Sequence, residues 1–503
     1  MHLHLEKSRD YLCVDIGAES GRIMAGTWDG KKLGLGEIHR FSNAPVSMGG
    51  TLRWDLVGLW KGVVEGLRRA HAQRGEAICS VGVDTWALDY VLQDARGEWL
   101  GLPYCYRDAR TSGLVEELCR RIPRAEIFAE TGLQFMEINT LCQLWAMQRG
   151  NPALLETARK FLMIPDWIHA ALSGVEACEF TNATTTQFLN PLTRRWSESL
   201  LQRLEIPTHF LPDLIGPGTL LGPLRAPVAS ETGLSNVNVI APATHDTASA
   251  VVAVPTRHTG KSNWAYLSSG TWSLLGVEIP QAQLSETVLR LNFTNEGGVD
   301  GTYRLLRNIM GMWLLQGLRR AFQQRNGDRD YASMVQLAAE APPLRSLVDP
   351  DAPEFLRAPD MVDAIQTACQ LRGEPIPDTE GQLVRCVLES LALRYRQVVE
   401  WLEEITGTPI EVVHIVGGGS RNALLNQFTA NACNRPVIAG PVETTALGNL
   451  LWQARTDGEM GSLAEARDVV RSAFAGDIRE FTPQRENLAQ WEAAHARWRA
   501  RVV

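Results

Sequence analysis

Alternating apolar and polar residues near the start of the chain predict a β-hairpin. Leu12, Val14 and Ile16 alternate with other residues, the segment DIGAESGR (15–22) follows, and a second apolar run, Ile23–Trp28, returns. Alternation of this kind is typical of a strand with one face in a core, and glycine beside small polar residues is typical of the turn between two strands. The turn itself therefore lies within residues 15–22.

The pattern after this hairpin changes to a helical period and then back to a strand. Apolar residues recur at every third or fourth position between residues 56 and 73, which predicts a helix with one buried face. The short apolar run at 77–83 predicts a buried strand that ends at Asp84. A hairpin, a helix and a strand in this order indicate an α/β domain.

A second hairpin of similar design is predicted much later in the chain. The apolar run Trp264–Leu267 leads into the small polar residues Ser268–Thr271, and Trp272–Val277 returns. Both hairpins place glycine and hydroxyl side chains between two apolar strands, which indicates an internal duplication with a boundary near 235–245. The predicted limits are 8–240 for the N-terminal domain, 241–480 for the C-terminal domain and 481–503 for a helical tail.

A third glycine-rich site lies in VVHIVGGGSRNALLNQF (412–428). Residues 412–416 are apolar and predict a buried strand, and Gly417–Gly419 allow the backbone to approach a flat ligand closely. Ser420 and Asn422 are suited to begin the helix that follows. A strand, then glycines, then a helix start is a common arrangement in nucleotide sites.

Composition and charge exclude several classes of function. The 503 residues carry a formal net charge of −8 and show no basic stripe, which argues against a nucleic-acid partner. No apolar run is long enough to span a membrane, and the N-terminal MHLHLEKSRD lacks the apolar segment of a secretory signal. We therefore expect a soluble globular protein of the cytoplasm.

The nine cysteines are scattered and form no C-x-x-C pair. No set of ligands has the spacing of a zinc site, so reduced thiols in a cytoplasm are expected. Cys369 and Cys386 flank one loop, and whether they pair is left open by the sequence.

Several familiar phosphate-binding motifs are absent. Gly260-Lys261-Ser262 matches the end of a P-loop, but Pro255 stands where its first glycine is needed. Gly34-Leu-Gly36 lacks the third glycine of a dinucleotide-binding turn, and protein-kinase signatures are missing. Two phosphate-type hairpins and a late glycine-rich turn are typical of the actin/hexokinase/Hsp70-like ATPases. We therefore expect two duplicated ribonuclease-H-like α/β domains with an active-site cleft between them.

Longer motifs make the resemblance more specific. The chain resembles the FGGY carbohydrate kinases, and among them the members that phosphorylate the ketose L-rhamnulose. The main stretches are DIGAESGR (15–22), VDTWALDY (83–90), YRDART (106–111), TNATTTQ (181–187), THDTASAV (244–251), AYLSSGTWSL (265–274), TNEGG (294–298), HIVGGGSRN (414–422) and AGPVETTALGN (439–449).

The resemblance implies an ATP-dependent sugar kinase and assigns roles to individual residues. Asp246 is implied as the base that takes the proton of the attacking sugar hydroxyl, and Asp15 as the residue that holds Mg²⁺ through water. The alternative for Asp246 is that it caps a helix at 247–254. The implied sugar-binding residues are Asp84, Trp86, Ala87, His245, Asp246, Thr247 and Asn308. The implied ATP-binding residues are Ala18, Glu19, Ser20, Gly21, Arg22, Thr271, Gln316 and Gly418.

Two features keep alternatives open. Ala87 stands where the L-rhamnulose kinases usually carry glycine, so an L-fuculose kinase or another ketose or polyol kinase is the first alternative. A non-catalytic sugar or nucleotide sensor is the remote one. Glu19 places a second acid in a phosphate turn, so we expect its side chain to turn away and pair with a cation such as Arg22 or a lysine, or to meet the water shell of the metal. The oligomeric state, monomer or dimer, is open.

Overall fold

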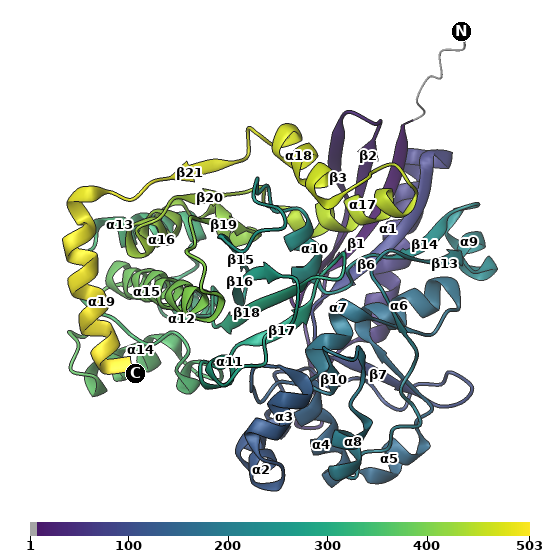
Figure 1. Cartoon of the computed structure of the whole chain (residues 1–503), viewed down its shortest axis with the longest axis horizontal. Helices are drawn as coiled ribbons and strands as arrows, with labels where there is room; N and C mark the ends of the chain where they lie inside the picture. The colour runs from purple at the N-terminus through teal and green to yellow at the C-terminus, as the bar shows by residue number, and fades with distance from the viewer. Residues whose placement is uncertain (1–7, 503) are drawn as a thin grey trace. The chain divides into compact units, whose positions relative to one another are not determined.

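The computed structural model describes residues 8–502, and the chain forms two compact units (Figure 1). The N-terminal MHLHLEK, for which no signal sequence is predicted, lies outside the described residues. Each unit is assembled from three stretches of chain. Unit 1 contains the chain up to Thr259, Glu278–Leu305 and Thr444–Ala473, and unit 2 contains Gly260–Val277, Leu306–Glu443 and the chain from Phe474 onward. The domain limits predicted at 8–240 and 241–480, and the tail at 481–503, stay predictions.

Unit 1 is built on a six-stranded sheet with the order β13-β14-β6-β1-β2-β3. β1 and β2 are antiparallel and are joined by residues 17–19, whereas β1 and β6 are parallel. The first predicted hairpin and the buried strand after the helix are thus confirmed. The strands are β1 (Arg9–Ile16), β2 (Ser20–Trp28), β3 (Leu33–Ser42), β6 (Ile78–Thr85), β13 (Thr219–Pro223) and β14 (Asn238–Ala241).

Helices pack against this sheet, and the predicted helix is among them. α1 (Leu56–Arg74) begins after Asp55, whose side chain accepts a hydrogen bond from the Gly58 N–H at 2.9 Å, and it packs on β2 and β3. α17 packs on β1 and β6, and α6 packs on β6 and β14. The other helices of unit 1 are α2 (Leu114–Arg121), α3 (Arg124–Thr131), α4 (Thr140–Gly150), α5 (Pro152–Thr157), α6 (Ile164–Ser173), α7 (Phe180–Ala183), α8 (Glu198–Arg203), α9 (Ala226–Thr232), α10 (Asp246–Val252), α11 (Glu286–Arg290), α17 (Thr444–Thr456) and α18 (Leu463–Ala473).

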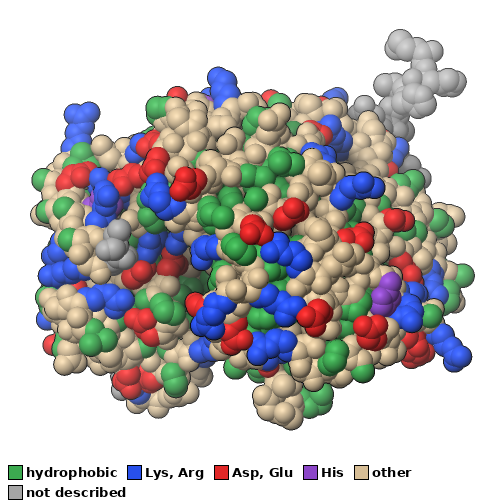
Figure 2. All heavy atoms as spheres, turned by 60° about the horizontal axis from the view of Figure 1, so that its bottom comes forward, with side chains coloured by type: hydrophobic (Ala, Val, Ile, Leu, Met, Phe, Trp, Pro, Cys, Tyr) green, Lys and Arg blue, Asp and Glu red, His purple; other side chains and the backbone are tan. Residues whose placement is uncertain are grey.

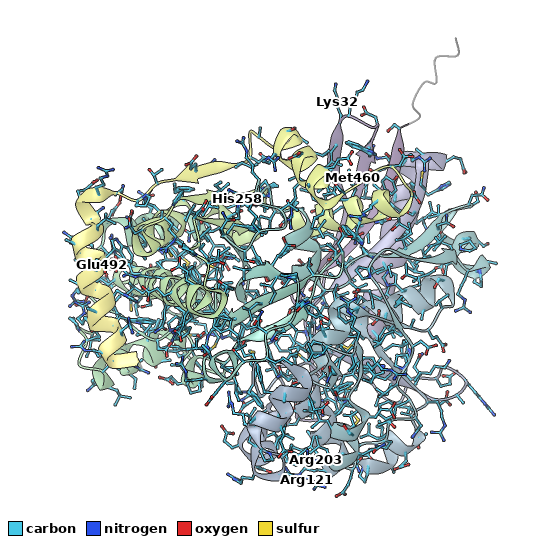
Figure 3. All side chains as sticks on the ribbon, viewed as in Figure 1. Lys32, Arg121, Arg203, His258, Met460 and Glu492 are labelled. Atoms are coloured by element: carbon cyan, nitrogen blue, oxygen red, sulfur yellow. The ribbon has the colours of Figure 1, made fainter. Side chains whose placement is uncertain are left out.

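Unit 1 also contains short strands outside the six-stranded sheet, and the last of them, β17, pairs with β18 in the second, seven-stranded sheet. They are β4 (Val46–Met48), β5 (Thr51–Arg53), β7 (Tyr90–Gln93), β8 (Lys160–Met163), β9 (Cys178–Glu179), β10 (Leu189–Asn190), β11 (Arg195–Trp196), β12 (Leu214–Ile215) and β17 (Thr294–Gly297). In Figure 3, Arg121 of α2 and Arg203 of α8 lie together, and Arg121 Nε donates to the Arg203 carbonyl at 3.0 Å.

α10 and α17 approach each other unusually closely in unit 1. A Cβ added to Gly448 of α17 would lie 1.8 Å from the Ser249 carbonyl oxygen of α10, so only glycine permits this contact. The helix that carries Asp246 is therefore positioned by a residue from the last part of the chain.

Unit 2 repeats the strand arrangement of unit 1. β15 and β16 form an antiparallel hairpin, and β15 is parallel to β19. The order β18-β16-β15-β19-β20 corresponds to β3-β2-β1-β6-β14, which confirms the predicted duplication. The strands are β15 (Trp264–Ser269), β16 (Ser273–Ile279), β18 (Tyr303–Ile309), β19 (Val412–Val416), β20 (Val437–Ala439) and β21 (Arg479–Phe481).

The helices of unit 2 are organised around α15, which is mostly buried and packs on α12, α13 and α16 (Figure 1). They are α12 (Trp313–Asn326), α13 (Tyr331–Glu340), α14 (Met361–Leu371), α15 (Glu380–Thr406), α16 (Ala423–Cys433) and α19 (Leu488–Val502). Cys369 of α14 and Cys386 of α15 are buried free thiols and do not form a disulfide.

The surface carries both signs of charge. On the face shown in Figure 2, acidic and basic side chains are interspersed over the surface. Within residues 8–502, no helix has both the length and the apolar composition needed to cross a bilayer.

Candidate active site

The turn between β1 and β2 presents free backbone donors. Gly17 N–H donates to the Ser20 carbonyl at 2.9 Å, and the side chain of Asn43 donates to the Gly17 carbonyl at 2.7 Å. The N–H groups of Ala18 and Glu19 have no hydrogen-bond partner among the described residues. Successive free N–H groups at a tight turn form a concave site for an anion, as predicted for this segment.

Arg22 forms its ion pair with the other acid of this segment, Asp15, and not with Glu19. Arg22 Nη2 lies 2.5 Å from Asp15 Oδ2, so Arg22 pairs with Asp15 and the predicted Glu19–Arg22 pair is wrong. The cause is the register of the hairpin, in which Asp15 and Arg22 are directly opposite. Glu19 is exposed at the tip and forms no ion pair with a described residue.

Asp246 is the first residue of α10. The helix begins after His245, so the alternative in which Asp246 caps a helix at 247–254 is wrong, because His245 occupies the capping position. Thr247 Oγ1 donates to Asp246 Oδ1 at 3.1 Å. Asp246 Oδ2 has no hydrogen-bond partner among the described residues, and a third of the side chain is exposed. One carboxylate oxygen is thus anchored and the other is free to meet a substrate.

His245 is held from one side by two residues to which the sequence assigned no role. Its Nδ1 lies 3.0 Å from Arg304 Nη2 and 3.2 Å from Glu296 Oε2, and all three side chains are buried. The Nε2 edge therefore faces Asp246, with 3.4 Å between Nε2 and Asp246 Oδ1. In the sequence, the motif TNEGG, which contains Glu296, was the one sign that this residue belongs to the site.

Three carboxylates gather at the ends of β1 and β6. Asp15 and Asp84 are register partners, and Asp84 is fully buried, with Oδ2 accepting from Asn449 Nδ2 at 2.6 Å. Burial raises the pKa of the Asp84 carboxyl well above its usual range, and the charges of Asp15 and Asp246 raise it further. Asp84 Oδ1 is buried without a hydrogen-bond partner.

This oxygen-rich, negatively charged set fits a divalent cation. Mg²⁺ prefers oxygen ligands, keeps several waters and is usually bound through one or two carboxylates. Within residues 8–502, no group of three or more histidine, cysteine or carboxylate side chains is arranged to hold a metal ion directly. The set therefore suits a hydrated ion more than a fully ligated one.

The predicted sugar wall, residues 84–89 of the motif VDTWALDY, begins in the last two residues of β6. The Thr85 N–H donates to the Thr244 carbonyl at 2.9 Å, which brings Trp86 and Ala87 near His245 in unit 1. Trp86 packs against Trp54 with ring centroids 4.4 Å apart. Trp86 is buried, and its contacts with neighbouring side chains fix its orientation.

Asp89 fixes that orientation. Its Oδ2 accepts from Trp86 Nε1 at 2.9 Å and from Trp54 Nε1 at 2.6 Å. Its Oδ1 accepts from Gln143 Nε2 at 3.0 Å. Burial raises the Asp89 pKa to about 6, against the opposing effect of these hydrogen bonds. Asp89 ends the stretch 84–89 that the resemblance places at the sugar, whereas Gln143 was given no role.

In unit 2, the second turn lies between β15 and β16, and Trp272 belongs to it and not to the returning strand. Gly270 N–H donates to the Trp272 carbonyl at 2.8 Å. Gln316 Nε2 of α12 donates to Thr271 Oγ1 at 3.2 Å. Because Oγ1 accepts this bond, the hydroxyl proton of Thr271 is left to donate to an anion.

The glycine-rich turn of unit 2 leaves one glycine open. Cβ atoms at Gly417 and Gly419 would meet Ser269 at 3.0 and 2.0 Å, and Gly417 has a φ of 80°, whereas a Cβ at Gly418 meets nothing within 4 Å. Asn422 caps α16 by accepting from the Leu425 N–H, but Ser420 bonds to the Gly417 carbonyl instead. The space at Gly418 is consistent with a ligand there.

The remaining predicted residue of unit 2, Asn308, lies on β18 and is partly exposed. Residues of unit 1 and unit 2 thus form two sets. One set contains the acids, His245, Trp86 and the first turn, and the other contains the second turn, Gln316, Gly418 and Asn308. The predicted cleft that would join them stays a prediction.

Replacing Gln316 by leucine tests the role of the second turn. The Thr271 hydroxyl loses its donor and rotates freely, so we expect the KM for ATP to rise by about fivefold to tenfold, which corresponds to the loss of about 1 kcal/mol of hydrogen bonding. Initial rates at varied ATP measure this. The exposed Gln336→Leu in the same unit is the control, and an unchanged KM for ATP in Gln316→Leu would contradict the assigned role.

Both halves of the chain match models of known protein families. The sequence model of the N-terminal domain of the FGGY family of carbohydrate kinases matches residues 11–253, and that of the C-terminal domain matches residues 265–456.

Curated relatives and solved structures cover nearly the whole chain. A rhamnulokinase from Bacteroides thetaiotaomicron is 44% identical over 97% of this chain and 98% of its own length. A rhamnulokinase from Bacillus subtilis is 40% identical over 94% of this chain and 95% of its own length. A gluconate kinase from Lactobacillus acidophilus has a TM-score of 0.80 at 15% identity, covering 98% of this chain and 97% of the other. Glycerol kinase from Plasmodium falciparum with ADP has a TM-score of 0.77 at 15% identity, with 98% of each chain covered. At such low identity these structures show the fold alone.

Proposed function

The chain belongs to the FGGY family of carbohydrate kinases, and we propose that it transfers the γ-phosphoryl group of ATP to the 1-hydroxyl of L-rhamnulose and releases ADP, as a step in L-rhamnose catabolism. The observation that carries the proposal is the free Oδ2 of Asp246 at the start of α10, together with the identity of 40–44% to rhamnulokinases over most of the chain.

Asp246 acts as the general base in this proposal. A sugar hydroxyl is too weakly acidic to ionise before it attacks, so a carboxylate beside it takes the proton as the new P–O bond forms. The bond from Thr247 orients the carboxylate, and His245, held by Glu296 and Arg304, presents its Nε2 edge to the same space. Nε2 and the Thr247 hydroxyl are placed to bind neighbouring sugar hydroxyls.

The nucleotide is bound mainly by backbone and hydroxyl donors. Phosphoryl transfer depends on positioning and on stabilising the charge of the transferred group. The free N–H groups of Ala18 and Glu19 and the hydroxyl of Thr271 are suited to donate to phosphate oxygens, and the open space at Gly418 is suited to the adenosine.

Kinases of this family use ATP and typically a divalent metal ion, and we propose that the ion is Mg²⁺. Asp15 would hold it through water, with Asp84, its register partner on β6, beside it. When bound, the ion neutralises charge on the phosphate oxygens. Arg22, which pairs with Asp15, orients this carboxylate.

Another ketose is the second candidate substrate, and Ala87 favours it. One methyl group at the sugar wall is worth about 1–3 kcal/mol of discrimination between substrates. An L-fuculose kinase would share the same base, turns and metal residues, so substrate rates and not the catalytic residues separate the two.

A coupled ADP-release assay over a panel of L-rhamnulose, L-fuculose, L-xylulose, L-ribulose and glycerol tests the proposal. We expect the largest kcat/KM for L-rhamnulose, with L-fuculose about tenfold or more below it. A higher kcat/KM for L-fuculose selects the alternative, and no sugar-stimulated ADP release overturns the kinase function itself.

A further inference from the structure

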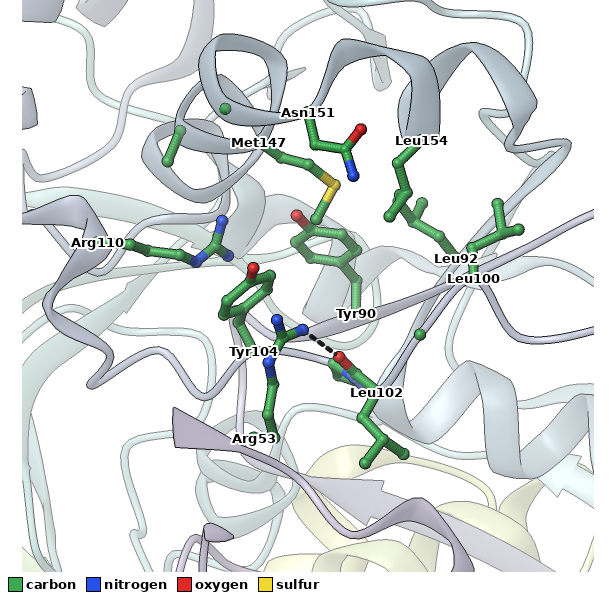
Figure 4. Close-up of a pocket in the computed structure, with 14 residues that line it drawn as sticks. Arg53, Tyr90, Leu92, Leu100, Leu102, Tyr104, Arg110, Met147, Asn151 and Leu154 are labelled. Atoms are coloured by element: carbon green, nitrogen blue, oxygen red, sulfur yellow. Dashed lines mark hydrogen bonds between the residues drawn. The ribbon is translucent and has the colours of Figure 1, made fainter. Parts of the chain in front are cut away.

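A cavity of about 380 Å³ lies in unit 1 among β7, the loop at residues 100–104, α4 and α5 (Figure 4). None of the residues that the sequence predicts to bind sugar, nucleotide or metal lines it. Its size is within the range of small-molecule sites in proteins. The cavity is therefore a second candidate binding site, separate from the kinase residues.

Two arginines give the cavity an uncompensated positive charge. Arg53 and Arg110 both stack on the Tyr104 ring, with their guanidinium carbons 3.3 and 3.7 Å from its centroid. Neither forms an ion pair within residues 8–502. Both side chains are half-buried, and no carboxylate lines the cavity, so the two guanidinium groups make it a favourable place for an anion.

Free donors remain on both guanidinium groups. Arg53 uses Nε for Thr51 Oγ1 and Nη1 for the Leu102 carbonyl, which leaves Nη2 (Figure 4). Arg110 uses Nη1 and Nη2 for Gln143, and its Nε is buried without a hydrogen-bond partner. Guanidinium groups bind carboxylate and phosphate by such paired donors.

The rest of the cavity is apolar. Its wall includes Leu92, Leu100, Leu154 and Met147, and Figure 4 shows these side chains around the space that the arginines face from the other side. Asn151 adds one amide at the rim. An anion with an apolar body fits this division better than a free inorganic ion, because an inorganic ion leaves the apolar wall uncovered.

A chain of hydrogen bonds connects the cavity to the predicted sugar wall. Arg110 Nη2 donates to Gln143 Oε1 at 3.1 Å, and Gln143 Nε2 donates to Asp89 Oδ1 at 3.0 Å. Asp89 Oδ2 in turn accepts from Trp86 Nε1. An anion that draws Arg110 towards the cavity weakens its hold on Gln143, and the change reaches Trp86 through two side chains.

We propose that this cavity is an effector site for an organic anion, a carboxylate or phosphate ester with an aromatic or aliphatic body, and that its occupancy alters sugar binding at Trp86. The second part rests on the proposed function, in which Trp86 contacts the sugar. The first part stands on the cavity alone.

Isothermal titration calorimetry of the full chain with 2-naphthoate, 2-naphthalenemethanol and acetate tests the site. We expect 2-naphthoate to bind with one-to-one stoichiometry. The neutral alcohol should bind about tenfold or more weakly, since one charge-assisted hydrogen bond to a guanidinium is worth at least that factor. Acetate should also bind about tenfold or more weakly, because it buries no apolar surface against the leucine wall. Arg53→Met should weaken 2-naphthoate binding by a similar factor. The exposed Arg68→Met on α1 is the matched control, and thermal unfolding verifies that both variants fold.

Leu154→Trp fills the cavity without removing a charge and should abolish binding of 2-naphthoate. Equal affinity of the wild type, Arg53→Met and Leu154→Trp for 2-naphthoate overturns the site. In kinase assays, 2-naphthoate should raise the KM for the ketose by about fivefold or more in the wild type, the lower range of allosteric coupling, and leave it unchanged in Leu154→Trp. Binding without this change overturns the coupling, and an inactive kinase that still binds 2-naphthoate overturns the proposed function and not the site.

Discussion

Replacing Asp246 by asparagine should lower kcat by about 10²- to 10⁴-fold, the usual contribution of a general base. Asparagine keeps the shape of the side chain and can keep the bond from Thr247, but its amide does not accept the proton of the sugar hydroxyl. Because Asp246 is partly exposed and its Oδ2 holds no other residue, we expect little change in the midpoint of thermal unfolding. The coupled ADP-release assay at saturating ATP and ketose measures kcat.

The matched control is Asp363→Asn, which removes an exposed carboxylate on α14. It should retain the wild-type kcat. If Asp246→Asn keeps more than about a tenth of the wild-type kcat, Asp246 is not the base. A large fall in its unfolding midpoint would instead show that the carboxylate stabilises the start of α10.

Replacing Arg467 by methionine should lower the free energy of unfolding by about 3–5 kcal/mol, the usual effect of removing one partner of a buried ion pair. Arg467 of α18 is fully buried and lies 2.8 Å from Glu278 Oε2. It also donates to the Val251 carbonyl at 2.9 Å, near the end of α10. Methionine removes the hydrogen bonds that Arg467 donates to the Glu278 carboxylate and to this carbonyl. Urea unfolding followed by tryptophan fluorescence measures the change.

The double variant Arg467→Met, Glu278→Gln provides the control. Glutamine at position 278 removes the negative charge that Arg467 balances, so the double variant should be more stable than Arg467→Met alone. Equal loss in both variants would show that the lost bond to α10, and not the buried charge of Glu278, sets the effect. A change below about 1 kcal/mol in Arg467→Met would contradict the prediction.

The parts of the fold that depend on neighbouring residues could be predicted from the sequence. The alternation in β1 and β2, the period of α1 and the glycine-rich turn before α16 are local patterns. The two wrong predictions of secondary structure also came from local patterns. Trp272 was placed in a strand because it is apolar, and Asp246 was considered a helix cap because small residues follow it, yet Asp246 is the first residue of the helix and His245 precedes it as the cap.

The support of the site depends on residues that are distant in the sequence. Arg304 and His245 are 59 positions apart, and Asn449 and Asp84 are 365 positions apart. No local period or spacing connects such pairs, and a buried arginine in a strand gives no sign of its partner. The motifs that contain Glu296 and Asn449 were recognised, but their roles became clear only from the hydrogen bonds.

The origin of α17 has a consequence for synthesis on the ribosome. This helix supplies Asn449 and Gln453 to the strands of unit 1, where Gln453 donates to the Leu12 carbonyl and accepts from Ser80. The sheet is complete in sequence by residue 241, but the helix that satisfies its polar groups emerges only after residues 260–443 have been translated. During synthesis, the sheet of the N-terminal half therefore lacks α17 on one face until nearly the whole chain has been made.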